Sequence, residues 1–263
     1  MARQVLCISS QVAYGPVGNS AAVPALHAAG FTVLQIPTII LSNHPGHGRP
    51  AGMRLPAADI GEILKKLVEL DVLGDCMGVM TGYFADAEQV KIAASHIREM
   101  KRESPELFVL VDPVIGDGDS LYVSTDVANA IRDDLVPLAT CITPNRFELS
   151  WLTQTPVLNR PDAASAARIL PCDEILATSI PASEGSIATL AISCSDSAEV
   201  ITRLRPSVPN GTGDFLAGLY LGCRLNGYEP AQALNLSSAI LEQAINRSVG
   251  QPWLDVIGAL HGH

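Results

Sequence analysis

The chain has 263 residues, of which 48% are hydrophobic and 17% charged, and its formal net charge is −10. This composition supports a large buried core and excludes extended disorder, and the acidic balance argues against non-specific binding to nucleic acid or to an acidic membrane surface. No apolar run reaches the roughly 18 residues that a membrane-spanning helix needs.

The first half of the sequence alternates between β-rich runs and segments with helical spacing. The run QVLCISS predicts a strand, and the segment after it predicts a helix that stops at Gly30. In chain order we expect strands at 4–10, 31–41, 76–82 and 107–112, helices at 19–30, 56–70 and 86–102, and a loop rich in glycine, proline and histidine at 42–53.

The second half continues the alternation. It predicts helices at 125–139 and 145–153, a strand at 140–143, and, after a proline-rich break, three strands at 173–179, 186–193 and 198–204. Two helices, at 213–227 and 230–249, complete the pattern. Such alternation indicates an α/β fold with a mostly parallel sheet and helices on both faces. We find no repeat or linker, so we expect a single domain over residues 1–263.

The cysteines give an expectation about the compartment. All six are scattered through the chain without a C-x-x-C pair, and several fall in apolar runs. The apolar run at the N-terminus is too short for a secretory signal. We therefore expect reduced, buried thiols in a cytoplasmic protein.

The loops that follow the predicted strands are the candidate ligand sites. In open parallel sheets, ligands bind beyond the carboxyl ends of the strands. This rule selects Ser9 and Ser10 together with the segments 42–52, 81–83, 112–119, 143–148 and 178–185, all of them rich in small and polar residues.

The strongest anion-binding signal is GTGD at 211–214, at the start of an apolar helix. A Walker-type G-x-x-x-x-G-K-[ST] motif is absent, and no G-x-G-x-x-G follows the first strand. The backbone N–H groups of Gly211, Thr212 and Gly213 would hold a phosphate at a helix N-terminus. Asp214 would then act as a general base on a hydroxyl beside that phosphate, or it is an ordinary helix cap.

Four oxygen-bearing residues follow two neighbouring predicted strands and suggest a cation site. They are Asp112, Asp117, Thr143 and Glu148, a donor set that suits Mg²⁺ or a monovalent cation. Each carboxylate taken alone is better explained as a solvated loop residue or part of a local turn. His44 and His47 form a pair without an evident third metal ligand, and the terminal HGH is interpreted as a tail.

Taken together and in this order, the motifs resemble those of the pyridoxal kinases of the ribokinase-like superfamily. The matching segments are SSQVAYGPVGNSAA, LSNHPGHG, MTGYFADAEQ, VDPVIGDGDSLYV, ITPNRFELSWLT and NGTGDFLAG, and they span about residues 5–246. GTGD and DPV are shared across the superfamily, whereas YGPVGN and SNHPGHG are more specific. The resemblance implies a three-layer αβα sandwich, a homodimer, and ATP-dependent phosphorylation of the 5′-hydroxyl of pyridoxal, and also of pyridoxine and pyridoxamine.

The resemblance also implies roles for individual residues. Asp214 falls on the catalytic position, and Gly211, Thr212 and Gly213 on the anion hole. Substrate-contacting positions fall on Ser10, Val17, His44 and Tyr83. Positions that contact ATP fall on Asn145, Thr178, Ser179 and Val208, and also on Asp112 and Glu148. Positions associated with Mg²⁺ and with K⁺ or Na⁺ fall on Asp112, Asp117, Thr143 and Glu148.

The loop at 42–53 departs from the family pattern. Pro45 stands where a threonine is common, Leu41 where a phenylalanine is frequent, and no aromatic residue occurs at 49–52, where a tryptophan is often found. The resemblance therefore implies a substrate rim with fewer aromatic side chains. The segment between the last predicted strand and GTGD is also short, which implies less cover over the nucleotide.

Three alternatives remain open on the sequence. A hydroxymethylpyrimidine kinase would act on a similar hydroxymethyl heteroaromatic compound, although YGPVGN and SNHPGHG favour pyridoxal. A sugar kinase is disfavoured because the early strand lacks the expected glycine and asparagine signals. A catalytically silent vitamer-binding protein would bind without producing ADP, and the presence of Asp214 beside an intact GTGD argues against it.

Overall fold

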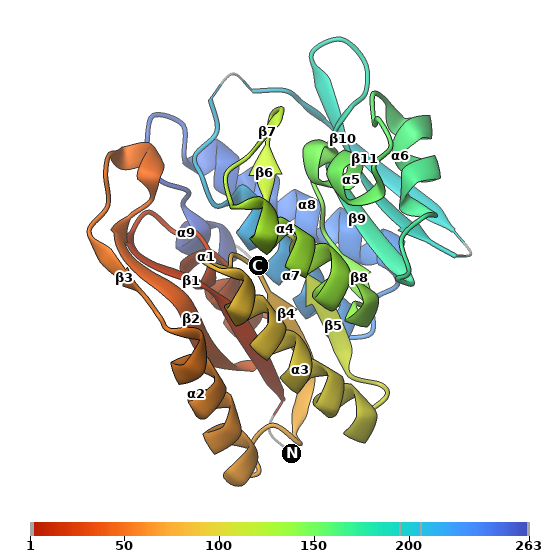
Figure 1. Ribbon diagram of the computed structural model, residues 1–263. Coiled ribbons are helices and arrows are strands. Elements are labelled where there is room, and N and C mark those ends of the chain that lie inside the picture. The colour runs from red at the N-terminus through yellow and green to blue at the C-terminus, as the bar shows by residue number, and fades with distance from the viewer. Residues whose placement is uncertain (1–2, 195, 206, 262–263) are drawn as a thin grey trace.

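A computed structural model describes residues 3–194, 196–205 and 207–261 of the chain. In this part of the chain the main sheet has nine strands in the order β11-β10-β9-β8-β5-β4-β1-β2-β3 (Figure 1). These strands are β1 (Gln4–Tyr14), β2 (Thr32–Asn43), β3 (Gly52–Arg54), β4 (Cys76–Thr81), β5 (Phe108–Val111), β8 (Cys141–Ile142), β9 (Glu174–Pro181), β10 (Ser186–Ser193) and β11 (Ser197–Arg203).

The centre of the sheet is parallel and its two edges are antiparallel. Strands β2, β1, β4, β5, β8 and β9 pair in parallel with their neighbours, whereas β3 pairs antiparallel with β2, and β10 and β11 continue antiparallel from β9. The carboxyl ends of the parallel strands therefore meet along one edge of the sheet. A separate hairpin of β6 (Gly116–Asp117) and β7 (Ser120–Leu121) stands at this upper end in Figure 1.

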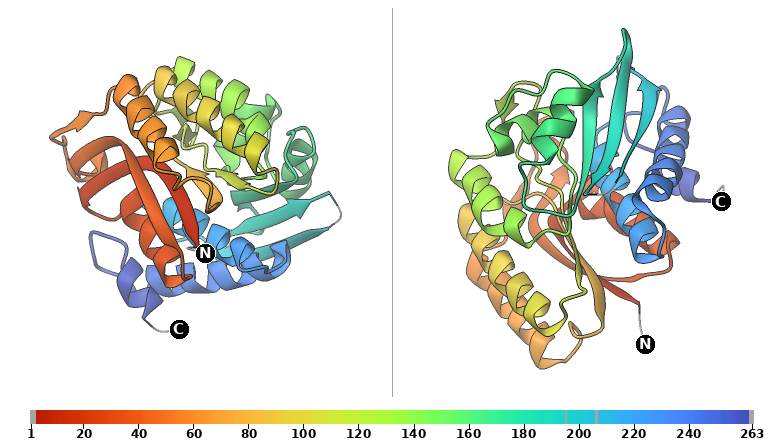
Figure 2. Two further views of the ribbon diagram at one scale, coloured as in Figure 1. Left: turned by 90° about the horizontal axis from the view of Figure 1, so that it is seen from below. Right: turned by 90° about the vertical axis from the view of Figure 1, so that its right-hand side faces the viewer.

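Helices cover both faces of the sheet. Figure 2 (right) shows α2 (Ala57–Glu69), α3 (Ala87–Glu103) and α4 (Thr125–Ala130) on one side, and α7 (Thr212–Leu225) and α8 (Pro230–Arg247) on the other. The core residues agree with this division, since those of α5 (Arg146–Thr153) and α6 (Arg160–Ala167) join the first layer and those of α1 (Asn19–Ala28) the second. The short helix α9 (Val256–Leu260) packs outside α1 and α7. The expected three-layer αβα sandwich with a mostly parallel sheet is confirmed.

The strands alternate their side chains between the two layers, as a buried sheet requires. In β1, Leu6 and Ile8 join the core beneath α2 and α3, whereas Val5 and Cys7 join the core beneath α1 and α7. All four side chains are at most 1% exposed. Burial on both faces explains why these strands read as continuous apolar runs in the sequence.

Helices α1 and α7 approach each other unusually closely. A Cβ on Gly218 of α7 would lie 2.7 Å from the carbonyl oxygen of Ala22, and one on Gly222 would lie 2.7 Å from the Cβ of Ala29. Only glycine lets two helix backbones meet at this separation. We call this contact of Gly218 and Gly222 with Ala22 and Ala29 the α1–α7 seam; it fixes the start of α1 beside the start of α7.

Several elements differ from the sequence prediction. Strand β1 continues past Ser10 to Tyr14, with a bulge between Ser9 and Gln11 in its pairing with β2. The segment predicted as one helix at 125–139 consists of α4, a π-helical turn (Ile131–Leu135) and a 3-10 turn (Val136–Leu138). The elements that the sequence pattern did not predict are β3, the 3-10 turn at Pro45–His47, the β6–β7 hairpin, α6 and α9, within the described residues.

The cysteines follow the expectation only in part. Each of the six is free in the described chain, and Cys7, Cys76 and Cys141 are buried. Cys172 and Cys223 are partly buried, and Cys194, just after β10, is exposed, so the expected burial holds for three of the six thiols. No helix in the described part of the chain is long and apolar enough to cross a bilayer.

Candidate active site

The predicted anion seat lies at the N-terminus of α7. Gly211 is the N-cap residue in the left-handed conformation, with φ of 95°, and no side chain caps the helix. Thr212 and Gly213 follow as the first helical residues, and Asp214 lies in the first turn. Because Gly211 occupies the N-cap position, Asp214 is not the N-cap residue of α7. The helix therefore begins with backbone N–H groups that no side-chain cap satisfies, an arrangement that suits an anion.

The loop at residues 15–18 is pressed against this seat. A Cβ on Gly211 would collide with the carbonyl oxygen of Pro16 and lie 3.3 Å from Cγ1 of Val17. A Cβ on Gly18 would in turn collide with Ser10. The structure thus brings Ser10 and Val17, both buried, next to the start of α7.

Asp214 is partly buried beside the loop at residues 15–18. Burial raises the pKa of its carboxyl group, while the backbone N–H of Gly18 and its own backbone N–H favour the ionised form. A carboxylate with a raised pKa is a better proton acceptor than an ordinary surface aspartate.

Asp112 lies in the same region, directly after β5. It is 7% exposed, and its Oδ1 accepts a hydrogen bond of 2.8 Å from the hydroxyl of Thr143, which follows the neighbouring strand β8. Burial raises the pKa of Asp112 well above its ordinary value, and the charges of Asp214 and Glu148 raise it further. Three carboxyl groups from distant parts of the sequence therefore share one site.

Glu148 and Asn145 form a capping box at the start of α5. The Asn145 side chain accepts from the N–H of Glu148 at 2.9 Å, and Glu148 Oε2 accepts from the N–H of Asn145 at 2.9 Å. Oε1 of Glu148 accepts from the N–H of Ile115 at 2.9 Å, which ties the loop after β5 to this helix. Glu148 is 3% exposed, and burial raises its pKa to about 7 despite these hydrogen bonds.

Asp117 and Tyr122 belong to the hairpin segment above the carboxylates. Asp117 is exposed on β6, and its carboxylate accepts from the N–H of Gly118 at 2.7 Å. Tyr122 follows β7 and is 55% exposed, and partial desolvation together with the charges of Glu148, Asp112, Asp214 and Asp117 raises the pKa of its hydroxyl. Sequence reasoning missed Tyr122, although it lies within the matched segment VDPVIGDGDSLYV.

Thr178 and Ser179 lie within β9, as the predicted strand at 173–179 implies, and the strand continues past them to Pro181. The pairing of β9 with β10 shifts register at this point, and Ser179 has a φ of 58°. Thr178 bridges to Asn145 and donates its N–H to the carbonyl of Pro144 at 2.9 Å. Val114, in the loop after Asp112, also has a positive φ of 42°. Such strain in residues other than glycine is concentrated at functional sites.

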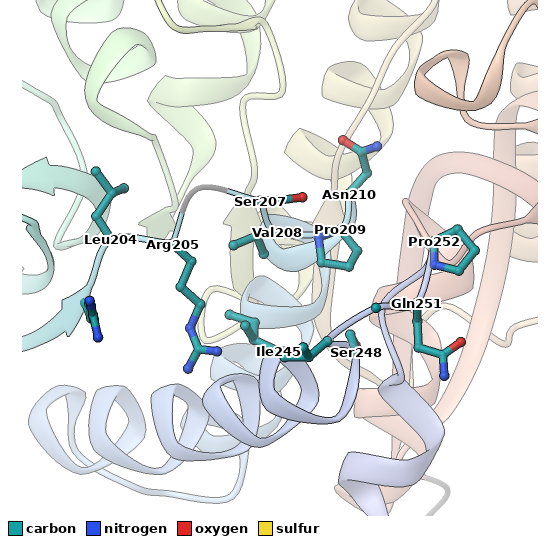
Figure 3. Close-up of a pocket in the computed structure, with 13 residues that line it drawn as sticks. Leu204, Arg205, Ser207, Val208, Pro209, Asn210, Ile245, Ser248, Gln251 and Pro252 are labelled. Carbon is teal, nitrogen blue, oxygen red and sulfur yellow. The ribbon is translucent and has the colours of Figure 1, made fainter.

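A pocket of about 990 Å³ opens beside the anion seat (Figure 3). Its walls come from two segments, the loop before α7, including Val208 and Asn210, and the segment after α8, residues 248–252. Val208 is 38% exposed and lines this pocket, as a residue in contact with a ligand would. This volume is at the upper end of the range of small-molecule sites.

His44 and Tyr83 lie just after β2 and β4, at the edge of the sheet where the parallel strands end. His44 precedes a 3-10 turn at Pro45–His47, and its Nδ1 accepts from the N–H of Gly46 at 3.0 Å. A Cβ on Gly46 would lie 2.9 Å from Nδ2 of Asn210, so this turn touches the loop before α7. The backbone N–H of Tyr83 donates to Ser9 Oγ at 3.2 Å, which ties the segment after β4 to β1.

The site does not contain a preformed cage for a metal. In the described part of the chain, no three histidine, cysteine, aspartate or glutamate side chains are grouped to hold a metal ion. The charges of Asp214 and Glu148 act on Asp112 and make this region negative, which favours a cation. Both oxygens of Glu148 already accept hydrogen bonds from backbone N–H groups. This arrangement fits Mg²⁺, which commonly binds through one or two carboxylates, waters and the phosphates of a substrate.

The chain is similar in sequence to known kinases that act on small molecules. A family model described as phosphomethylpyrimidine kinase matches residues 19–252. The chain is 36% identical over 255 residues to pyridoxal kinase PdxY of Rubrobacter xylanophilus, covering 92% of this chain and 88% of that protein. It is 34% identical over 248 residues to a pyridoxine/pyridoxal/pyridoxamine kinase of Bordetella avium, covering 92% and 84% of the two chains.

Solved structures of pyridoxal kinases have the same fold as this chain. The pyridoxal kinase of Entamoeba histolytica superposes with a TM-score of 0.94 at 26% identity, covering 100% of this chain and 95% of that one. The pyridoxal kinase of Leishmania donovani in complex with ADP and pyridoxamine gives a TM-score of 0.92 at 25% identity, covering 98% and 95%.

Proposed function

Since this chain belongs to the family of phosphomethylpyrimidine and pyridoxal kinases, we propose that it transfers the γ-phosphoryl group of ATP to the 5′-hydroxyl of pyridoxal, pyridoxine or pyridoxamine. The observation that carries the proposal is the placement of Asp214. Its carboxylate lies in the first turn of α7, beside an N-terminus without a side-chain cap and in a partly buried position that raises its pKa.

The chemistry follows from this placement. The N–H groups of Gly211, Thr212 and Gly213 bind the transferring phosphoryl group, and Asp214 accepts the proton of the attacking hydroxyl. General-base catalysis of this kind contributes roughly 10²–10⁴-fold to the rate. Water is excluded on one side by the loop at residues 15–18, which packs directly against Gly211.

The cation is the second part of the proposal. Mg²⁺, when bound with ATP, neutralises negative charge on the phosphates. Asp112 is the residue best placed to hold this ion. The Thr143 hydroxyl orients its carboxylate, and a bound cation would offset the repulsion from the neighbouring carboxylates. Glu148 contributes through its negative charge and holds the loop after β5, and Asp117 stays a proposed ligand at the rim. K⁺ or Na⁺ remains a proposed additional ion.

The two substrates occupy opposite sides of Asp214. We propose that the nucleotide lies in the pocket lined by Val208, with its phosphates towards Asn145, Thr178 and Ser179. The B6 vitamer lies against Ser10, Val17, His44 and Tyr83, where a flat heterocycle meets apolar and hydrogen-bonding groups. A homodimer and a cytoplasmic location complete the proposal.

A panel assay tests this function. ADP release is measured with MgATP and pyridoxal, pyridoxine, pyridoxamine or hydroxymethylpyrimidine, for the parent and for Asp214→Asn. We expect turnover with the three vitamers and a loss of at least about 10²-fold in kcat in the variant. Preference for hydroxymethylpyrimidine would favour the other activity of this family, and vitamer binding without ADP release would indicate a silent binding protein. A variant within about tenfold of the parent would disprove the role of Asp214 as base.

A further inference from the structure

We propose that Tyr14 and Trp253 are positioning residues that couple the nucleotide pocket to the turn at residues 44–48, so that each substrate strengthens the binding of the other. This inference rests on the proposed function, because it takes the pocket of Val208 as the nucleotide site and the turn as part of the vitamer site. Neither residue touches the reacting atoms in this proposal.

Three aromatic rings from distant segments meet at the rim of the site. The Tyr14 ring, at the end of β1, lies edge-on to the His47 ring at a centroid distance of 5.3 Å and an interplanar angle of 73°. It also lies edge-on to the Trp253 ring at 5.7 Å and 76°. Both are favourable aromatic geometries. Tyr14 therefore links the turn that carries His47 to the segment that carries Trp253.

The segment that carries Trp253 is also a wall of the nucleotide pocket. Residues 248–252 line that pocket, and Trp253 follows directly (Figure 3). Both ends of the segment are fastened to each other, since Ser248 Oγ accepts from the N–H of Asp255 at 2.8 Å and Arg247 pairs with the Asp255 carboxylate at 2.8 Å. A ligand that restrains residues 248–252 must therefore also restrain Trp253.

The turn contacts the second wall of the same pocket. Gly46 lies against the side chain of Asn210, which lines the pocket. Gly15 lies close to the ring of His47, since a Cβ added to Gly15 would be 3.4 Å from Nε2 of that ring. The turn thus touches both segments that a nucleotide would restrain, one through Asn210 and one through Tyr14 and Trp253. A nucleotide that orders both walls reduces the entropy that the vitamer must lose in ordering the turn.

The solvent exposure of Tyr14 and Trp253 indicates that the cluster has a role other than packing in the core. Tyr14 is 45% exposed and Trp253 is 40% exposed, so neither ring contributes mainly to the core. The loop at 49–52 carries no aromatic residue of its own. The aromatic contact to this turn is instead made by Tyr14, which packs on His47 and is itself contacted by Trp253 from the other end of the chain.

Calorimetric titration tests the coupling directly. The affinity for pyridoxal is measured with and without a non-hydrolysable ATP analogue and Mg²⁺, and the affinity for the analogue with and without pyridoxal. We expect each ligand to strengthen the other by the same factor, roughly fivefold or more, because coupling between sites is reciprocal. In Trp253→Ala the factor should fall at least threefold, with a higher KM for pyridoxal and kcat within about twofold of the parent.

Two controls separate positioning from general damage. Trp253→Phe keeps a ring and should restore most of the coupling, whereas Tyr228→Ala removes a ring that is 43% exposed beyond α7 and should leave the coupling unchanged. The chain has two tryptophans, so Trp151→Phe leaves Trp253 as the sole tryptophan. Its fluorescence should change when pyridoxine or the analogue is added, which tests the link without removing Trp253.

The outcomes distinguish this inference from the proposed function. Phosphorylation of vitamers together with equal coupling in the parent and Trp253→Ala would overturn only the coupling. The same holds if Trp253→Phe loses as much coupling as Trp253→Ala, or if Trp253 fluorescence in Trp151→Phe responds to neither ligand. If no vitamer or nucleotide binds at all, both the proposed function and the coupling are wrong.

Discussion

The hydroxyl of Thr143 donates a 2.8 Å hydrogen bond to Oδ1 of Asp112, which joins the ends of two adjacent strands, β5 and β8, inside the candidate active site. This bond stabilises the ionised form of Asp112, while burial and the charges of Asp214 and Glu148 oppose ionisation. The fraction of Asp112 that is ionised, and so able to bind a cation, therefore depends on the uncharged hydroxyl of Thr143.

Thr143→Val should weaken the response to Mg²⁺. The substitution keeps the shape of the side chain but removes the donor, so the pKa of Asp112 rises further and less of the carboxylate is available. A hydrogen bond to a charged group is worth about 1.5–3 kcal/mol, which predicts a rise of roughly tenfold or more in the Mg²⁺ concentration for half-maximal turnover. Thr153→Val removes a hydroxyl that bonds to Leu149 on α5 and should leave this concentration unchanged. An unchanged Mg²⁺ dependence in Thr143→Val would refute the assignment.

Gly211→Ala should destabilise the fold far more than Gly213→Ala. Gly211 has a φ of 95° and an added Cβ would collide with Pro16, whereas an added Cβ on Gly213 meets nothing within 4 Å. We expect a loss of about 2 kcal/mol or more in the free energy of unfolding for Gly211→Ala and a change within about 0.5 kcal/mol for Gly213→Ala. Urea unfolding of both variants measures this difference, and equal losses would contradict the close packing of the two loops.

His44 should titrate below its ordinary pKa of 6.5, because burial and, secondly, the nearby His47 disfavour its charged form. Its Nδ1 accepts from the N–H of Gly46, which also requires the neutral ring. The contribution of His44 to stability is therefore fully present above pH 6.5 and is lost as the pH falls below that value towards the lowered pKa.

Two measurements examine His44. An NMR titration should report a pKa below 6.5 for its ring. Unfolding experiments at about pH 7.5 and about pH 5 should show a larger acid-induced loss of stability for the parent than for His44→Asn, which accepts the same hydrogen bond without titrating. A titration at or above the ordinary value would count against the observed hydrogen bond.

The ion pair of Glu174 and Arg224 should matter for stability and not for catalysis. Both oxygens of Glu174 accept from Nε of Arg224, at 3.2 and 3.0 Å, and the two side chains are 4% and 19% exposed. The pair lies at the amino end of β9, away from the candidate site. Arg224→Met leaves the buried carboxylate without its positive charge, with the Tyr220 hydroxyl still donating to it, and should cost about 3–5 kcal/mol.

A second variant makes this prediction specific. Adding Glu174→Gln to Arg224→Met removes the unpaired charge and should recover a large part of the lost stability, as measured by thermal or denaturant unfolding. The kcat of folded protein should match that of the parent in both variants. If the double variant is as unstable as the single one, the loss comes from packing and not from charge.

Much of the fold was predictable because hydrophobic periodicity determines buried elements. The parallel strands and the helices α2, α3, α7 and α8 follow from runs and spacings of apolar residues. Helix α6 was missed because it is short and rich in alanine, so it carries no clear apolar stripe. A signal was nevertheless present, since Asn159 caps the helix by accepting from the N–H of Asp162 three residues later.

The site was predictable only where a motif carried its chemistry. GTGD indicated the anion seat, and strand order indicated that Asp112 and Thr143 lie close together. No local pattern predicted that Tyr122 lies near the charges of the carboxylates or that the Tyr14 ring contacts both His47 and Trp253, because these contacts depend on how distant segments pack. The left-handed backbone of Ser179 inside β9 accompanies a register shift against β10, which is a property of strand pairing and not of composition.

The α1–α7 seam has a consequence for attempts to alter which compounds the protein accepts. Gly218 and Gly222 leave no room for a larger side chain against Ala22 and Ala29, so the two helix starts cannot be moved apart without unfolding their contact. Laboratory evolution towards bulkier acceptor alcohols should therefore find its adaptive substitutions in the exposed turn between β2 and β3, and rarely along these helices.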